Sequence, residues 1–437
     1  MFSDKDVQER LDQVLEDFAI NEETMKEMKS AFLLHMEKGW SSAEGRGADP
    51  ADSSLKMLTS HVNVFATGRE HGVYYAIDLG GSNLRVLRVE IRPNFPPLID
   101  EIRCSIPASV REKSATPEQL FGFIASTAKQ LTDKHKETSS QPVGFTFSFP
   151  MSQESISSAK LIEWTKGFET SDCVGKDPAA LLADAFATAS VPLHITALCN
   201  DTVGTLMTCA YEFKGCPTCR VGVILGTGTN AAYVDPALNN LIVNIEWGGF
   251  NSPAMRRTSF DDQLDKSSPN PGKQFLEKLV SGMYLGELAR LATIHVLGKG
   301  YILPSQFSTA FGFETSDLSE FLSSSEVMPL GATESTVLTC IGNAVLDRSA
   351  CICAAALSAV ADRTLNTGRR NSSVDGTLLT IGIDGSLFTK CHKYPERLSK
   401  AMTKVCGTEF ASQVKFVRSN DGSGVGAAVI AAALTHQ

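Results

Sequence analysis

Apolar residues recur at helical spacing through the first part of the chain. Between residues 4 and 39 they return every three or four positions, which places them on one face of a helix. A polar stretch rich in Gly, Ala, Asp and Ser follows at residues 41–54 and is typical of a loop. We therefore predict a helical segment and a loop over residues 1–54.

The rest of the chain alternates between strand and helix patterns. Short apolar runs between turn residues predict strands, over residues 73–79, 84–91, 143–149, 195–199 and 378–383. Helical spacing predicts helices, over residues 117–131, 179–189, 202–211, 272–297, 335–365 and 427–434. Strands that alternate with helices indicate the α/β class.

Two of the predicted helices have clear start signals. Thr116 is placed as a cap, Pro117 as the first helical residue, and Gln119 completes a capping box. Asp177 and Pro178 open the next helix by the same logic.

Two glycine-rich turns, each between two strands, look like one device used twice. The first contains Gly80, Gly81, Ser82 and Asn83, and the second occupies residues 226–229. Glycine in such turns supplies positive φ angles and bare backbone N–H groups. Converging N–H groups bind phosphate oxygens. We therefore expect two half-domains around a cleft, gripping one polyphosphate between them.

The pattern suggests a division into two α/β domains after the N-terminal segment. We expect a small domain over residues 55–200 and a large domain over residues 201–437. The last helix, about residues 425–437, is expected to pack back on the small domain. A chain of 437 residues with 43% hydrophobic residues is long enough for two such domains.

Charge and cysteine content limit the partners. The net charge of −9 at pH 7 argues against nucleic acid or an anionic membrane as the main partner. It does not argue against a nucleotide, whose phosphates are bound by local N–H groups. The 11 cysteines are expected to be free thiols in a reducing cytosol. Cys216 and Cys219 lack a second pair at zinc spacing, and we interpret them as part of a turn.

Nothing in the sequence favours export or membrane insertion. The N-terminal residues are polar and acidic, without the apolar core of a signal peptide or a basic transit pattern. We find no apolar run of the roughly 18 residues that a membrane helix needs; the longest candidate covers residues 349–361. We expect a cytoplasmic protein with no stable membrane insertion.

Several polar residues stand at strand ends, and each has two interpretations. Asp78 is either an Asx-type turn former or an anchor for a metal ion beside phosphates. Asp201 is either a helix N-cap or a general base at the carboxyl end of a parallel strand. Lys166 is either a solvated surface cation or part of a polar patch with Ser148. Glu246 and Glu277 are either surface or paired glutamates, or acceptors for the hydroxyls of a polyol ligand.

The common nucleotide and hydrolase motifs are absent from the sequence. It contains neither a P-loop nor a Gly-x-Gly-x-x-Gly fingerprint after its first strand. It also lacks His-Glu-x-x-His and Gly-x-Ser-x-Gly. If phosphate is bound, paired hairpins must bind it.

Nine segments, in order along the chain, resemble the motifs of the eukaryotic-type hexokinase family. That family shares its superfamily with actin and the heat-shock chaperone ATPases. The segments are residues 79–85, 144–150, 161–168, 200–205, 226–230, 244–248, 271–278, 383–386 and 421–424. The resemblance extends from about residue 55 to the end of the chain. It implies a two-lobed sugar-kinase fold and the phosphorylation of a hexose, such as glucose, at its 6-hydroxyl by ATP.

The resemblance also implies roles for individual residues. Asp201 would be the catalytic base, and Lys166 would meet the transferring phosphoryl group. The sugar hydroxyls would be held by Ser148, Thr165, Lys166, Asn200, Asp201, Asn230, Glu246 and Glu277. ATP would be bound by Asp78, Gly80, Gly81, Ser82, Asn83, Arg85, Gly226, Thr227, Gly228, Gly385 and Ser386. Asp78 would hold Mg²⁺ through water. The family implies small-molecule partners and a monomer or homodimer.

Three departures from the family pattern put regulation and nucleotide affinity in doubt. Thr59 stands where the family often has Pro, and Val425 where it often has Lys. The segment between the second glycine turn and Glu246, residues 235–243, is also shorter than the family pattern.

Two alternatives to an active kinase remain. One is a catalytically silent glucose sensor, which should have lost Asp201, Lys166 or one phosphate loop. The other is an actin-like or chaperone-like ATPase, which would not need the sugar-binding set.

Overall fold

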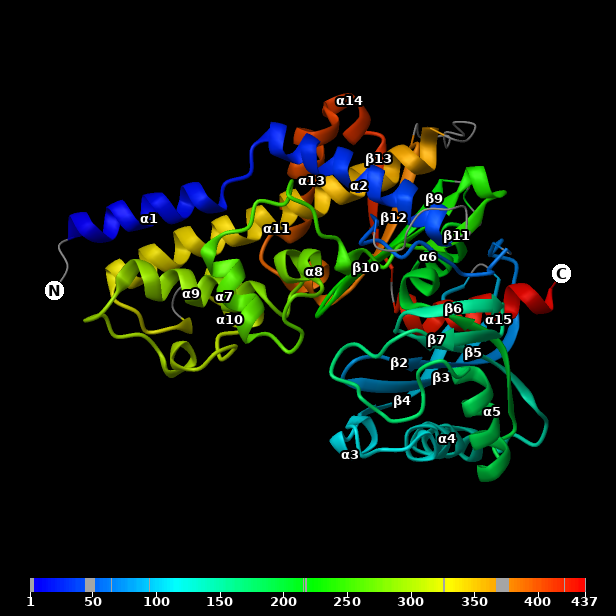
Figure 1. The fold of residues 1–437 in the computed structure, drawn as a ribbon. Coiled ribbons are helices and arrows are strands. Elements are labelled where there is room, and N and C mark those ends of the chain that lie inside the picture. The colour runs from blue at the N-terminus through cyan, green and yellow to red at the C-terminus, as the bar shows by residue number, and fades with distance from the viewer. Residues whose placement is uncertain are drawn as a thin grey trace.

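Two β-sheets, one in each lobe, organise the chain (Figure 1). The computed structural model describes residues 4–436 except 44–51, 64, 94, 215, 217, 325–326, 367–376 and 420. The order of the five-stranded sheet is β4-β3-β2-β5-β8. Its strands are β2 (Gly72–Leu79), β3 (Asn83–Ile91), β4 (Leu98–Ser105), β5 (Gln141–Phe147) and β8 (Leu193–Cys199). A separate hairpin joins β6 (Met151–Ser155) to β7 (Ser158–Leu161).

The order of the six-stranded sheet is β1-β11-β10-β9-β12-β13. Its strands are β1 (Leu58–Thr59), β9 (Cys219–Leu225), β10 (Thr229–Asp235), β11 (Leu241–Asn244), β12 (Leu379–Asp384) and β13 (Val414–Arg418). Strand β1 pairs with β11, so residues 58–59 join the sheet of the large lobe, although the sequence places them at the start of the small domain. Thr59 pairs with Val243, which lies 184 positions later in the chain.

 Leu58 pairs with Asn244 in the same way, and so distant a pairing leaves no local signal in the sequence.

Helices cover both faces of the small-lobe sheet. On the outer face lie α3 (Ala108–Arg111), α4 (Pro117–Lys134) and α5 (Pro178–Ala189) (Figure 1). On the inner face lies α15 (Gly422–Thr435), which packs on β2 and β5, while α6 (Asp201–Glu212) packs between α15 and the large-lobe sheet. The two central helices therefore connect the lobes.

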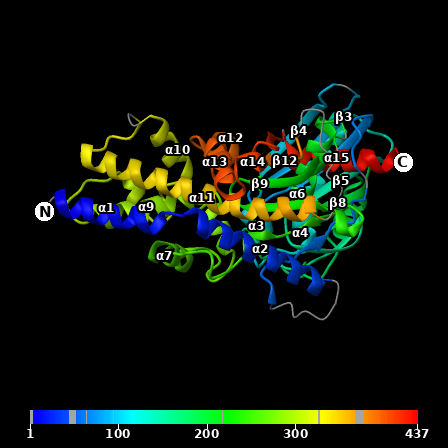
Figure 2. The same ribbon diagram turned by 90° about the horizontal axis from the view of Figure 1, so that it is seen from above.

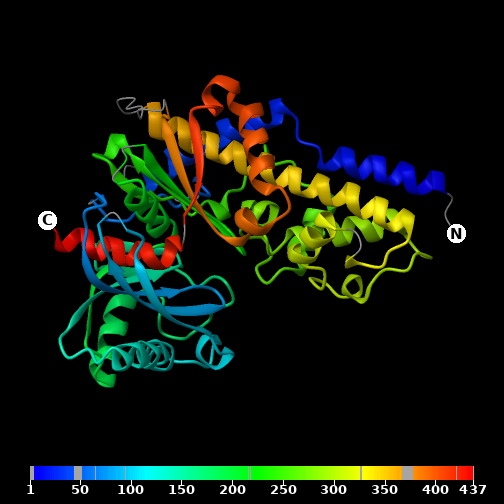
Figure 3. The same ribbon diagram turned by 180° about the vertical axis from the view of Figure 1, so that it is seen from behind.

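Long helices form the other side of the large lobe. Figure 2 shows α1 (Asp4–Phe18) and α2 (Glu22–Ala43) running beside α11 (Ala332–Asn366). Seen from behind in Figure 3, α13 (Tyr394–Cys406) and α14 (Thr408–Ala411) lie close to β13. The remaining α-helices are α7 (Ser259–Ser267), α8 (Phe275–Val280), α9 (Leu285–Leu297), α10 (Thr315–Ser323) and α12 (Ser386–Lys390). The apolar faces of α1 and α2 belong to the core of this lobe.

Local start signals are confirmed. The Thr116 side chain accepts from the Gln119 N–H and the Gln119 side chain from that of Thr116, which completes the capping box of α4. The Asp177 side chain caps α5 by accepting from the Ala179 N–H. The predicted loop at 41–54 begins later than expected, because α2 continues to Ala43; residues 44–51 lie outside the described residues.

The predicted single helix over 272–297 is wrong, because it is broken between α8 and α9. At the break, the Gly282 N–H donates to the Gly226 carbonyl (2.8 Å) and the Met283 N–H to the Thr227 carbonyl (3.2 Å). These backbone donors bind the second glycine turn instead of the preceding helical turn. The break therefore supports that turn.

Glycine permits the close crossing of α6 and α15. A Cβ on Gly426 would lie 2.1 Å from the carbonyl oxygen of Gly204. A Cβ on Gly144 of β5 would lie 2.1 Å from the carbonyl oxygen of Ala427. Both neighbours are backbone atoms, which cannot turn aside as a flexible side chain can. The small residues therefore let α15 pack directly on its sheet and on α6.

Helix α11 is long and apolar enough to cross a membrane by length and composition, contrary to the expectation of no such segment. In the fold, 89% of its most apolar window is buried, as in the core helix of a soluble domain. The 11 cysteines are all free thiols, and seven of them are buried.

Candidate functional site

Asp201 stands where β8 meets α6, at the boundary of the two lobes. Asn200 is the N-cap residue, and its side chain accepts from the Thr202 N–H (3.0 Å). Asp201 is the first helical residue, and its Oδ1 also accepts from the Thr202 N–H (2.9 Å). The cap function that the sequence allowed for Asp201 therefore belongs mainly to Asn200. The Asp201 side chain is mostly buried and keeps Oδ2 for another partner.

Lys166 faces Asp201 from the small lobe. Its Nζ lies 3.7 Å from Asp201 Oδ2 and donates to the backbone carbonyl of Ser148 (2.8 Å). Lys166 has a φ of 55° and Gly167 one of 76°, so the segment after β7 turns sharply here. A Cβ on Gly81 would lie 3.0 Å from the Lys166 Cβ. The first glycine turn thus lies against the lysine.

Four polar residues form a network beside this pair. The Asn230 side-chain amide donates to Oδ1 of Asn244 (2.8 Å) and, at longer range, to Oδ1 of Asn200 (3.3 Å). Asn244 in turn donates to Glu246 Oε1 (2.8 Å). Burial raises the pKa of Glu246, and the hydrogen bond from Asn244 acts in the opposite direction. This network brings Asn200, Asn230 and Glu246 together.

Glu277 of α8 completes the polar wall of the large lobe. Its Oε2 accepts from the Thr229 N–H at 3.0 Å. A Cβ on Gly228 would lie 2.6 Å from this oxygen. Burial raises the pKa of Glu277, while the Thr229 N–H lowers it and the charges of Glu246 and Asp201 raise it further. The carboxylates of Glu246, Glu277 and Asp201 therefore act on one another.

Ser148 and Thr165 lie on the small-lobe side with Lys166. Ser148 is buried and follows β5, and its N–H donates to the Leu79 carbonyl at 3.4 Å. Thr165 directly precedes Lys166, and its carbonyl accepts from the Phe168 N–H (3.1 Å). Trp164 and Phe168 stack beneath this segment with a centroid separation of 5.3 Å.

Asp78 ends β2 beside the first glycine turn. Burial raises its pKa to about 6, and the charge of Arg85 and the hydrogen bond from Ser423 oppose that rise. Ser423 Oγ donates to Asp78 Oδ2 at 2.8 Å. A carboxylate that burial destabilises in this way would be stabilised by a nearby cation, so the residue fits a site for hydrated Mg²⁺.

Arg85 is surrounded by carboxylates. Its guanidinium forms a bidentate ion pair with Asp421, contacts Glu101 Oε2 at 2.7 Å, and lies 3.8 Å from Asp78 Oδ2. The arginine therefore ties β3 to the start of α15. Its charge is shared among three anions.

The two glycine turns are hairpins, as predicted, but their glycines do not have positive φ. The structure pairs β2 with β3 and β9 with β10 as antiparallel hairpins. Gly80, Gly81, Gly226 and Gly228 all lie outside the left-handed region. These positions need glycine for space instead, since Gly81 approaches Lys166 and Gly228 approaches Glu277.

Gly385 and Ser386 adjoin the second turn. Gly385 has a φ of 121°, and a Cβ there would lie 2.3 Å from the Leu225 carbonyl oxygen. The preceding Asp384 accepts from the Gly385 N–H (2.7 Å) and the Gly422 N–H (2.9 Å). Burial raises the pKa of Asp384. The ends of β12 and β9 and the start of α15 thus meet here.

The expected residues occupy two neighbouring areas. Around Lys166 and Asp201 lie Ser148, Thr165, Asn200, Asn230, Glu246 and Glu277. Around the two turns lie Asp78, Gly80, Gly81, Ser82, Asn83, Arg85, Gly226, Thr227, Gly228, Gly385 and Ser386. Among the described residues, no group of three or more His, Cys, Asp or Glu is arranged to hold a metal ion.

Four polar partners of these residues lie in segments that the sequence analysis identified as motifs, but it gave them no role. They are Asn244, Ser423, Asp421 and Asp384. Asn244 had a local signal, because it lies two residues before Glu246. Ser423 and Asp421 lie in the motif at 421–424, but nothing in the sequence pairs them with Asp78 and Arg85, which lie more than 300 residues earlier in the chain.

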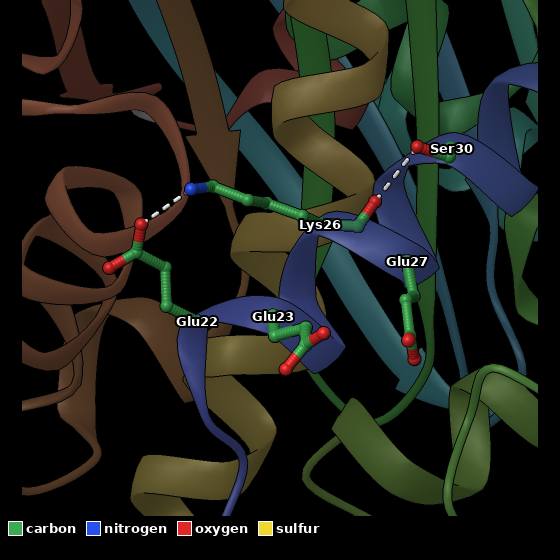
Figure 4. Close-up of a pocket in the computed structure, with 5 residues that line it drawn as sticks. All are labelled: Glu22, Glu23, Lys26, Glu27 and Ser30. Carbon is green, nitrogen blue, oxygen red and sulfur yellow. Dashed lines mark hydrogen bonds and ion pairs between the residues drawn. The ribbon is translucent and has the colours of Figure 1, made fainter.

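A surface hollow on α2 is separate from this site. It is lined by Glu22, Glu23, Lys26, Glu27 and Ser30 (Figure 4). Lys26 is paired with Glu22 (2.6 Å), and the lining comes from consecutive turns of one helix. The hollow contains none of the predicted site residues.

Known proteins provide an independent comparison. Two family models, both described as hexokinase, match residues 10–211 and 220–433. Hexokinase-1 of Spinacia oleracea is 36% identical over 449 residues, which cover 93% of this chain and 87% of that protein. Hexokinase-1 of Rattus norvegicus is 36% identical over 455 residues, which cover 97% of this chain but 48% of that protein. The chain therefore spans about half the length of the rat relative.

Solved structures agree over nearly the whole chain. A crystal structure of a hexokinase has a TM-score of 0.86 at 33% identity and covers 99% of this chain. A hexokinase from Schistosoma mansoni, solved with glucose, has a TM-score of 0.84 at 31% identity, also over 99% of this chain. The two-lobed arrangement is thus that of these structures.

Proposed function

The chain belongs to the hexokinase family, and we propose that it transfers the γ-phosphoryl group of ATP to the 6-hydroxyl of a hexose. The products are hexose 6-phosphate and ADP. The observation that carries the proposal is the meeting of Lys166 Nζ and Asp201 Oδ2 at 3.7 Å, beside buried polar residues of the large lobe. This arrangement supplies a base and a cation at one point.

Asp201 acts as the base in this proposal. Its Oδ1 is held by the Thr202 N–H, which leaves Oδ2 to accept the proton of the 6-hydroxyl. The hydroxyl oxygen forms a bond to the γ-phosphorus as the bond to the ADP oxygen breaks. Lys166 stabilises the negative charge on the transferring group. Positioning and electrostatics of this kind account for most of the catalysis of phosphoryl transfer.

The hexose lies between the lobes in this proposal. Glu246 and Glu277 accept hydrogen bonds from its hydroxyls, and Asn200 and Asn230 contribute amide groups. Ser148, Thr165 and Lys166 contact it from the small lobe. Closure of the lobes around the sugar excludes water, which is the competing nucleophile.

The triphosphate lies between the two glycine turns in this proposal. Gly80, Gly81, Ser82 and Asn83 provide the first clamp, and residues 226–228 the second. Gly385 and Ser386 lie toward the adenosine. Asp78 holds Mg²⁺ through water, and the bound ion would neutralise phosphate charge. Three carboxylates already neutralise much of the charge of Arg85. We therefore expect Arg85 to contribute less to phosphate binding than the two glycine turns.

Asp201→Ala tests the proposed chemistry. We expect kcat to fall by roughly 10²–10⁴-fold, the usual contribution of a general base, with glucose binding largely retained. A coupled assay of ADP formation, with and without glucose, measures kcat, and equilibrium binding without ATP measures affinity. Asp133→Ala, on the exposed side of α4, is the matched control and should leave both unchanged.

The same assay separates the alternatives. A silent sensor would bind glucose without forming ADP, and an actin-like ATPase would form ADP at the same rate without glucose. Either result with the native protein would refute the proposal. Retention of Asp201, Lys166 and both turns favours the active kinase over the sensor.

We further propose that the protein works in the cytoplasm at the entry of glucose into glycolysis, as a monomer or homodimer. Burial of most of the apolar window of α11 supports the absence of membrane insertion. Light scattering coupled to size-exclusion chromatography would measure the oligomeric state.

A further inference from the structure

The geometry points to Glu163 as a positioning residue that links the two lobes beside the sugar site. Its carboxylate contacts two cations of the opposite lobe, Lys56 and Lys273. We call these three residues the interlobe clasp. The inference rests on the proposed function, because it concerns hexose affinity.

Glu163 belongs to the small lobe. It follows β7 and precedes Lys166 by three residues. The neighbouring backbone is fixed, since the Leu161 N–H donates to the Lys176 carbonyl (3.0 Å) and the Ile162 N–H to the Pro150 carbonyl (3.0 Å). A force on Glu163 is therefore transmitted to the segment that carries Thr165 and Lys166.

Both lysines belong to the large lobe. The Lys56 N–H donates to the Ile245 carbonyl at 3.2 Å, one residue before Glu246. Lys273 lies four residues before Glu277, and its N–H donates to the Asn270 carbonyl at 3.2 Å. The two cations are thus attached next to the two glutamates that face the sugar in the proposed function.

The ion pairs cross between the lobes. Lys56 Nζ hydrogen-bonds to Glu163 Oε1, and Lys273 Nζ lies 3.6 Å from Oε2. Partial burial raises the pKa of Glu163, but the two lysines outweigh it and the net direction is downward. The carboxylate thus remains charged near neutral pH. Lys273 is the more exposed lysine, with 69% of its side chain accessible against 30% for Lys56.

The clasp favours the arrangement in which Lys166 faces Asp201. Opening the cleft would separate Glu163 from both lysines, so their attraction stabilises the closed lobes. None of the three residues contacts the reacting atoms in the proposed function. The clasp therefore acts on hexose affinity, through closure, and leaves the chemical step nearly unchanged.

Glu163→Gln and Lys273→Met test this inference in the full chain. We expect each to weaken glucose binding by about two- to fivefold, the range for a partly exposed ion pair, with kcat unchanged within twofold. Tryptophan fluorescence measures glucose affinity without ATP, because Trp164 adjoins Glu163. The double variant Glu163→Gln/Lys273→Met should bind glucose as tightly as Glu163→Gln alone, because Glu163→Gln already removes the ion pair with Lys273.

Salt dependence gives a second readout. Glucose is uncharged, so a loss of glucose affinity between about 0.05 M and about 0.5 M NaCl reports screening of ion pairs within the protein. The native protein should show this loss, and Glu163→Gln should show less of it. Glu154→Gln, which breaks the Lys160–Glu154 pair within the β6–β7 hairpin, is the matched control and should behave like the native protein.

The outcomes distinguish the inference from the proposed function. Native protein that binds no glucose would overturn both. Native protein that binds glucose, with Glu163→Gln binding it equally well and with the same salt dependence, would overturn the clasp alone. Equal unfolding midpoints for Glu163→Gln and the native protein would show that the variant is folded.

Discussion

Single carboxylates illustrate how position sets their chemistry. The exposed Glu22 forms a surface pair with Lys26, whose hydrogen bond lowers the pKa of this carboxyl group. Burial raises the pKa of Glu246 and Glu277 instead. Their charged forms have few compensating partners, and hydroxyl donors from a sugar would supply them. The raised pKa values thus mark the groups that gain most from a polyol ligand.

This difference predicts a pH dependence of glucose binding. A carboxylate accepts two hydrogen bonds more readily than the neutral acid, and a raised pKa means that protonation begins at a higher pH than for an ordinary glutamate. Glucose affinity should therefore be fully present at neutral and higher pH. It should weaken as the pH falls, beginning at a higher pH than that at which an ordinary glutamate is protonated. Equilibrium binding of glucose as a function of pH measures this.

Glu277→Gln separates the two glutamates in that profile. The variant should bind glucose about tenfold or more weakly, since hydrogen bonds to charged groups are worth roughly 1.5–3 kcal/mol. Its loss of glucose affinity at acid pH should be shallower, because Glu246 is then the one remaining member of this pair of glutamates with a raised pKa. Glu154→Gln is the surface control. An acid limb as steep as that of the native protein would contradict the assignment of Glu277.

At the scale of elements, helices α6 and α15 depend on glycine where they cross. The contact of Gly426 with Gly204 is between backbones, with no side chain that can yield. Helix α15 in turn packs on β2, and Ser423 in its first turn donates to Asp78. A shift of α15 at the crossing would thus reach the first glycine turn, which follows Asp78.

Gly426→Ala should destabilise the fold. The added Cβ would lie 2.1 Å from the Gly204 carbonyl oxygen, and relieving such overpacking costs typically about 1–3 kcal/mol, sometimes more. Urea unfolding measures the change. Gly122→Ala in α4 is the control, since no atom lies within 4 Å of its Cβ position; it should be neutral or stabilising by up to about 1 kcal/mol. Equal stability of both variants would refute this account.

The sequence predicted most elements because their signals are local. Thr116 and Gln119 mark the start of α4, and the antiparallel hairpins surround the two glycine turns. The break at Gly282 was missed because its N–H donates to Gly226, far away in the chain. The expectation of positive φ at the turn glycines was wrong. Glycine is needed there because neighbouring side chains, such as Lys166 and Glu277, leave too little room for a Cβ.

The candidate site was predicted by motif and not by contact. Family resemblance selected Asp201 and Lys166, but their separation of 3.7 Å depends on how the lobes meet. The sequence could not predict the partners of Arg85, since Asp421 reaches it from the far end of the chain. Roles of the individual residues in sugar and ATP binding stay predictions.

At the scale of the whole molecule, the chain passes between the lobes at several places. It leaves β1 of the large-lobe sheet for β2, leaves β8 for α6, and leaves β13 for α15. These connections lie near the central helices, whereas the clasp closes near the sugar site. We expect the lobes to rotate about the central helices.

Small-angle scattering can test this motion. At about 0.5 M NaCl, where the ion pairs of the clasp are screened, the radius of gyration without glucose should exceed that at low salt. Adding glucose should reduce it again. Glu163→Gln should have the larger radius already at low salt. A radius that is independent of both glucose and salt would contradict the rotation.

The buried free thiols have a practical consequence. Cys199 ends β8 directly before Asn200, and it is fully buried beside Thr146; burial raises its pKa to about 12. A thiol in this state reacts with an alkylating reagent only after the surrounding elements separate. Peptide mass spectrometry of alkylation over time would therefore measure how often these elements separate, without any introduced label. The half-buried Cys104 provides an internal reference for the reagent.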